Sequence, residues 1–175
     1  MTIVSGSRRV VAGVDGSAES VAALMWACRE AVLRDADVHA VLAVEAACHR
    51  QASYAAAPRH AETKGSWGAA RDVLRRAVSD ASARYPGITV RAEVVEGLAA
   101  RILLDRSAGA DMLVLGRTQH GPDRHRGAGP VIRACLRSAA CPVVVISATD
   151  ALATDQANVD HVPEAWQRVL EQAAR

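Results

Sequence analysis

This 175-residue sequence lacks several features that mark particular classes of protein. It contains no Phe, and Lys64 is its only Lys. No apolar run approaches the roughly 18 to 20 residues that a membrane-spanning helix requires. Residues 1–9 lack the charged start and apolar centre of a signal peptide. We therefore expect a cytoplasmic protein that does not contact a membrane.

A strong charge of either sign is also absent. The formal net charge is +2, whereas proteins that track a nucleic-acid backbone concentrate positive charge far more strongly. We therefore expect no nucleic-acid partner. Half of the residues are hydrophobic, which is enough to bury the core of one domain.

Cysteine spacings typical of metal or redox sites are missing as well. The four cysteines are Cys28, Cys48, Cys135 and Cys141. They form no C-x-x-C pair and have no His at metal-binding spacing. We expect reduced thiols and no metal site, with Cys28 and Cys135 acting as small hydrophobic residues on helix faces.

The stretch 111–146 carries the most information. Met112–Leu115 is a continuous apolar run, typical of a parallel strand covered on both faces, and Gly116 ends it. The following loop, 117–129, is rich in Gly, Arg and His and could hold an anion. Pro130 then favours a helix start. That helix has an apolar stripe made of Val131, Cys135 and Leu136. A second buried strand at 143–146 completes the unit.

The first part of the chain predicts a strand followed by a helix. Val10–Val14 reads as a buried strand, and Ser17 is a good N-cap for an amphipathic helix over 18–34. Asp15 follows the strand at the edge where doubly wound folds bind ligands. It could hydrogen-bond a ribose or an adenine edge, or it could simply cap the turn, and the sequence leaves both readings open.

The middle of the chain continues the alternation of strands and helices. We expect a strand at 37–44, a long surface loop at 45–68, and a helix that begins near Trp67 and ends before Pro86. An alternating strand at 88–95 suits a sheet edge. The next helix, 98–107, should place Leu98, Ile102 and Leu103 inward.

This order predicts an α/β fold, an open five-stranded parallel sheet with helices on both faces. We assign residues 1–149 to this domain and 150–175 to a C-terminal extension. Four apolar residues in the extension recur at roughly helical spacing, namely Val162, Trp166, Val169 and Leu170. They favour either a short docking helix or a frayed tail, because so short a helix is marginal without packing.

Residues 8–147 resemble the universal stress protein family. The residues that carry the resemblance are Val14-Asp15-Gly16-Ser17, Trp26-Ala27, Gly97, the spaced glycines Gly116 and Gly129, and Cys141-Pro-Val-Val-Val-Ile146. The resemblance implies a Rossmann-like sheet of order 3-2-1-4-5, with a ligand crevice between the first and fourth strands. The nucleotide-binding branch reads Gly, two residues, Gly, nine residues, Gly, then Ser or Thr. Here Gln119 replaces the second Gly, and Pro130 replaces the Ser or Thr.

The resemblance also implies a set of site residues. Asp15 and Val44 would contact adenosine, and Gly116, Arg117 and Gly129 would contact phosphates. The complete candidate site is Gly13, Val14, Asp15, Val44, Gly116, Arg117, Gln119, Gly129, Pro130 and Val131. Because Gln119 carries a Cβ, and Pro130 lacks both an N–H and a hydroxyl, we expect weak or absent ATP binding.

Three hypotheses about function follow. The first is a non-enzymatic stress-response regulatory or interaction module, resembling relatives that form homodimers through the strand at 143–146. The second is an ATP-binding protein of the same family. The third is an enzyme that cleaves a phosphate ester with His120 or His125 as acid or base, but neither histidine has a confidently placed carboxylate partner.

Overall fold

The computed structural model describes residues 8–45, 60–117 and 128–147, and the side chains of 60–66 are not described. The elements, in chain order, are β1 (Arg9–Gly13), α1 (Ala18–Arg34), β2 (Asp37–Val44), α3 (His60–Arg84), β3 (Val90–Glu96), α4 (Ala99–Ser107), β4 (Met112–Gly116), α5 (Pro130–Ser138) and β5 (Val143–Ile146). Strand and helix alternate as the sequence predicts.

The five strands form one parallel sheet in the order β3-β2-β1-β4-β5. This confirms the predicted fold class and strand order. The inner strands are mostly apolar, and Val10, Val11 and Ala12 of β1 are fully buried, because helices cover both faces of the sheet. The edge strands β3 and β5 are only partly buried.

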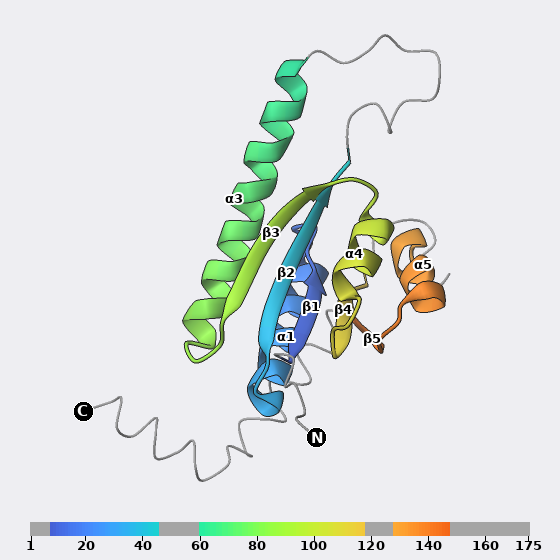
Figure 1. Cartoon of the computed structure of the whole chain (residues 1–175). Helices are drawn as coiled ribbons and strands as arrows, with labels where there is room; N and C mark the ends of the chain where they lie inside the picture. The colour runs from blue at the N-terminus through green and yellow to red at the C-terminus, as the bar shows by residue number, and fades with distance from the viewer. Residues whose placement is uncertain (1–7, 46–59, 118–127, 148–175) are drawn as a thin grey trace, which may run out of the picture.

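Two helices pack on each face of the sheet (Figure 1). On one face α1 and α3 enclose a core around Leu24, Val38 and Leu74. On the other face α4 and α5 enclose a second core around Val11, Leu103 and Leu113. The chain leaves β1 toward the first face and β4 toward the second.

One predicted boundary is wrong: the loop expected at 45–68 is shorter, because α3 begins at His60 and not near Trp67. Figure 1 shows this N-terminal part of α3 extending beyond the sheet. A helical segment with no sheet beneath it needs no apolar stripe, so hydrophobic periodicity could not predict it. Gly65 and Gly68 also argued against a helix, although an interior Gly costs only about 1 kcal/mol.

Two predictions of inward-facing side chains are also wrong. Leu98 and Leu136 are each 54% exposed. Leu98 is the N-cap of α4 and lies outside the helix. In α5, Ile132 takes the inward position beside Cys135 that the predicted stripe gave to Leu136. The predicted extension 150–175 lies outside the described residues.

Candidate functional site

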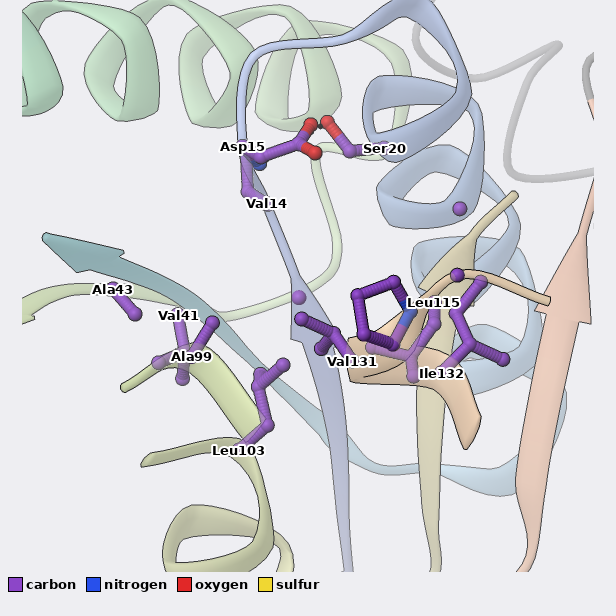
Figure 2. A pocket seen from close by; sticks show the side chains of 14 residues that line it. Val14, Asp15, Ser20, Val41, Ala43, Ala99, Leu103, Leu115, Val131 and Ile132 are labelled. Atoms are coloured by element: carbon purple, nitrogen blue, oxygen red, sulfur yellow. Dashed lines mark hydrogen bonds between the residues drawn. The ribbon is translucent and has the colours of Figure 1, made fainter. Parts of the chain in front are cut away.

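A cleft of about 250 Å³ opens at the carboxyl ends of β1 and β4 (Figure 2). The residues that line it are Gly13, Val14, Asp15, Ser20, Val41, Ala43, Ala99, Leu103, Leu115, Gly116, Gly129, Pro130, Val131 and Ile132. The cleft lies between neighbouring strands whose following helices pack on opposite faces of the sheet. Parallel sheets bind ligands at such a reversal of strand order.

Asp15 provides the charge at the rim of the cleft. Its Oδ1 accepts hydrogen bonds from the backbone N–H of Ser17 at 2.9 Å and from the Ser17 hydroxyl at 2.6 Å. The Ser20 hydroxyl lies beside the carboxylate, but no described residue donates to Oδ2 as the Ser17 groups donate to Oδ1. The carboxylate therefore stabilises the turn into α1 with one oxygen and leaves the other available to a ligand. The capping role is present, and it does not exclude the ligand-binding role.

The turn around Asp15 is held by two serines. The Ser17 hydroxyl oxygen accepts from the Ser20 N–H at 3.2 Å and so caps α1, as predicted. The Ser20 hydroxyl donates to the Ser17 carbonyl at 2.9 Å and accepts from the Asp15 N–H at 3.2 Å. Figure 2 shows the Ser20 side chain directed toward the Asp15 carboxylate.

This network keeps Asp15 ionised. Partial burial raises the pKa of its carboxyl, but the hydrogen bonds from Ser17, the neighbouring Ser20 hydroxyl and its own backbone N–H together outweigh burial, so the pKa lies below the ordinary 3.8. At neutral pH the cleft therefore presents a carboxylate, which accepts hydrogen bonds and does not donate them.

The walls of the cleft are apolar. Val41 and Ala43 come from β2, Leu103 from α4, and Leu115 from β4. Gly13 leaves room between them, because a Cβ there would lie 2.8 Å from Cδ2 of Leu115. Such walls suit the flat apolar face of a ligand, while Asp15 suits its hydroxyl or amino donors.

The N-terminus of α5 provides the opposite charge. Gly129 is the N-cap and makes no side-chain capping bond. The first intrahelical bond runs from the Arg133 N–H to the Gly129 carbonyl at 2.9 Å. The N–H groups of Val131 and Ile132 therefore have no partner among the described residues, and Pro130 has no N–H at all. Two N–H groups and the positive end of the helix dipole lie at the cleft.

The two glycines of the predicted motif differ in their surroundings. A Cβ on Gly116 would lie 2.4 Å from the carbonyl carbon and oxygen of Glu19 and 2.5 Å from the N of Ser20. Gly129 has φ −59°, and a Cβ there would meet no described atom within 4 Å. Gly116 is thus required by the packing of α1 on β4. The described structure around Gly129 does not require a glycine.

Arg117 and Val44 lie apart from the cleft lining. The Arg117 N–H donates to the Ile146 carbonyl at 2.8 Å, so it extends the β4–β5 ladder and is not available to a ligand. The Val44 side chain is buried in the core beneath α1 and α3. Val41 and Ala43 line the cleft instead, because successive side chains of a strand point to opposite faces. Gln119 lies outside the described residues.

Sequence reasoning missed seven lining residues: Ser20, Val41, Ala43, Ala99, Leu103, Leu115 and Ile132. Most belong to elements that were correctly predicted. The strands are buried on both faces, however, so their patterns do not show which side chains face the cleft.

The described residues outside the cleft offer no reactive buried thiol and no metal site. Burial raises the pKa of Cys28 to about 11 and also raises that of Cys135, so neither buried thiol is readily ionised. Within the described ranges, no group of three His, Cys, Asp or Glu could hold a metal ion. None of the described helices is long and apolar enough to cross a membrane.

Comparison with known proteins agrees with the observed fold. A model of the universal stress protein family matches residues 6–147. The chain belongs to the universal stress protein family. It is 32% identical over 148 residues to a universal stress protein of Mycolicibacterium smegmatis, covering 83% of this chain and 50% of that protein. A relative from Mycobacterium tuberculosis is 32% identical over 151 residues, with the same coverage. The chain spans about half the length of these curated relatives.

Solved structures of other universal stress proteins share the fold. UspA from Lactobacillus plantarum superposes with a TM-score of 0.63 at 21% identity, covering 79% of this chain and 97% of that one. A universal stress protein in complex with cAMP gives 0.60 at 22% identity, covering 81% and 98%. The Archaeoglobus fulgidus protein in complex with dAMP gives 0.57 at 22% identity, again covering 81% and 98%.

Proposed function

We propose that this universal stress protein binds an adenine nucleotide weakly in the cleft and acts as a non-enzymatic regulatory or interaction module in the stress response. One observation carries the proposal. The Asp15 carboxylate and two α5 N–H groups that have no partner among the described residues line the same apolar cleft.

The chemistry of an adenine nucleotide matches these three features. Its ribose hydroxyls or amino group would donate to Oδ2 of Asp15. Its purine ring would lie against the apolar walls beside Val41 and Leu115. Its phosphate would accept from the N–H groups of Val131 and Ile132 at the positive end of the helix. The cAMP and dAMP complexes of proteins with this fold support the choice of ligand.

Weak binding follows from the donors that the site lacks. Pro130 supplies neither an N–H nor a hydroxyl, and the Arg117 N–H is already bonded to Ile146. A hydrogen bond to a charged group contributes about 1.5 to 3 kcal/mol. The loss of two such bonds would weaken binding by about a hundredfold or more. ATP, with the largest phosphate charge to satisfy, should be affected most.

A purely binding role is supported by the charge content of the cleft. Among the described lining residues, Asp15 alone is ionisable. Acid–base catalysis commonly pairs two titratable groups in one site, or one such group with a nucleophile. The enzymatic alternative depends on His120 or His125, both outside the described residues.

We also propose that the protein is a homodimer joined through β5. Val143, Val144 and Val145 lie on an edge strand and are only partly buried. An apolar edge strand favours pairing with a second chain, and a twofold axis would let two copies of β5 cover each other. The cytoplasmic location expected from the sequence stays a prediction.

Saturation-transfer NMR of the natively purified protein with AMP, cAMP and ATP tests the proposed ligand, because this method detects weak complexes. Uridine monophosphate serves as the matched control, since it carries the same phosphate and ribose on a smaller base. We expect signals from the adenine protons of AMP and cAMP and weaker signals from uridine monophosphate. Equal signals, or no transfer to any adenine nucleotide, would contradict the proposal.

A further inference from the structure

The turn that carries Asp15 is in contact with a helix that does not itself line the cleft. Gly16 has a φ of +86°, a conformation that side-chain-bearing residues rarely adopt. A Cβ built on Gly16 would lie 2.7 Å from Cγ1 of Val73 in α3 and 3.7 Å from its Cγ2. The isopropyl group of Val73 therefore fills the space in which a side chain at position 16 would lie.

The exposure of Val73 shows that packing in the core is not its only contact. It remains 36% exposed, whereas its neighbour Leu74 is 2% exposed and packs on the sheet together with Ala77. Leu74 and Ala77 thus fix α3 on the sheet, and Val73 projects from the same turn of α3 onto Gly16. The contact joins a firmly packed helix to a turn that is otherwise exposed at Asp15 and Gly16.

Gly16 is placed where a backbone shift would reach the Asp15 carboxylate. Gly16 lies between Asp15 and Ser17, the two residues joined by the 2.9 Å and 2.6 Å hydrogen bonds to Oδ1. If Gly16 moves, these bonds lengthen and Oδ2 changes its direction relative to the cleft.

We propose that Val73 is a positioning residue of the nucleotide site, which holds the Asp15 carboxylate in its binding direction by packing against Gly16. The inference rests on the proposed nucleotide binding. It also makes α3 a regulatory element, because any partner that displaces α3 weakens the nucleotide complex, and by linkage the nucleotide opposes that displacement.

The test compares Val73→Ala with Val78→Ala. Val78 lies on the same helix and is partly buried against the same core, whereas the three atoms nearest to a Cβ on Gly16 all belong to Val73. We expect Val73→Ala to weaken AMP binding about five- to tenfold, the usual size of such indirect effects. Val78→Ala should lower the melting temperature at least as much and leave the affinity unchanged. Val73→Ile, which keeps the branched group, should retain binding.

A double-mutant cycle tests the contact from its other side. Gly16→Ala should weaken binding through its clash with Val73 and through its strained φ. Val73→Ala removes the clash, so the double variant should bind more tightly than the sum of the two single effects predicts. Additive effects, together with equal affinities of Val73→Ala and Val78→Ala, would overturn the inference.

Measuring the Asp15 pKa without nucleotide tests this inference separately from the proposed function. Titration of the Asp15 carboxyl carbon by NMR should show that its pKa moves up toward the ordinary value in Val73→Ala and stays unchanged in Val78→Ala, because only the first substitution loosens the Ser17 bonds. If the wild-type protein binds no nucleotide but this shift is seen, the proposed function fails and the positioning contact stands. An unchanged pKa in Val73→Ala would contradict the contact itself.

Discussion

Gly116 at the end of β4 lies directly against the backbone of Glu19 in the first turn of α1, so that a Cβ on Gly116 would come within 2.4 Å of the Glu19 carbonyl. Backbone atoms of a helix cannot yield as the end of a flexible side chain can. The absence of a side chain at this position therefore lets α1 cross β4 closely, next to the turn that holds Asp15.

Gly116→Ala should consequently be strongly destabilising. The added methyl group must push α1 away from β4, and overpacking of this kind typically costs about 1 to 3 kcal/mol, occasionally more. We expect a loss of about 3 kcal/mol in the free energy of unfolding, measured by urea denaturation. A loss below about 0.5 kcal/mol, the range of ordinary surface substitutions, would show that the close approach is unimportant.

Gly129→Ala should have the opposite effect on stability. The φ of −59° suits alanine, and no described atom lies within 4 Å of the added carbon. Restricting the unfolded chain should stabilise the protein by about 0.4 to 1 kcal/mol. The methyl group would, however, obstruct a phosphate approaching the start of α5, so AMP affinity should fall. A variant that is more stable and binds AMP as well as the wild type would exclude a phosphate at Gly129.

His39 on β2 should make stability depend on pH. Burial is the main cause of its pKa lying below 6.5; Glu93 acts to raise this pKa, and Arg9 and Arg106 act to lower it. His39 Nε2 lies 3.0 Å from Oε2 of Glu93, and Arg106 donates to both oxygens of that carboxylate at 2.7 and 2.8 Å. At neutral pH the uncharged imidazole can donate this bond.

Proton linkage gives the direction in which the free energy of unfolding changes with pH. The unfolded chain binds a proton at His39 more tightly than the folded chain does, so the contribution is fully present above the unfolded pKa of about 6.5 and is lost as pH falls toward the folded pKa. His39→Gln keeps a donor for Glu93 and removes the titration. Urea denaturation between pH 7.5 and 5 should therefore show a steeper loss of stability in the wild type than in the variant. Parallel pH profiles would contradict this account.

The dimer proposal is tested by a charge on β5. Val144→Lys should convert a dimer into a monomer, because pairing two copies of the edge strand would bury the ammonium group. Ala92→Lys is the matched control, since Ala92 is an exposed residue on the other edge strand, β3. Light scattering gives the mass, and circular dichroism checks that both variants are folded. A monomeric wild type at micromolar concentration would rule out the dimer.

The sequence predicted well those features that are encoded by local pattern. The apolar run at Met112–Leu115 indicated β4, and Ser17 correctly marked the start of α1. The strand order came from the family resemblance, since short parallel strands carry little information about their neighbours. The start of α3 was missed because that part of the helix extends past the sheet and needs no apolar stripe.

The site was harder to predict because its residues depend on packing between elements. Sequence could not show that Val41 faces the cleft while Val44 faces the opposite core. Nor could it separate the packing role of Gly116 from the open position of Gly129. The contact of Val73 with Gly16 joins two residues 57 positions apart in the numbering, and neither belongs to the predicted set of site residues.

Isothermal titration of AMP into the wild type and into Asp15→Asn tests the central claim most directly. Asparagine can keep an oxygen acceptor for Ser17, so the turn should persist, but it replaces the available carboxylate oxygen with a donor. We expect the wild type to bind AMP at one site with a Kd of about 10 µM to 1 mM. Asp15→Asn should bind at least about tenfold more weakly with a nearly unchanged melting temperature. No binding by the wild type, or equal affinity in the two proteins, would contradict the assignment of this cleft as a nucleotide site centred on Asp15.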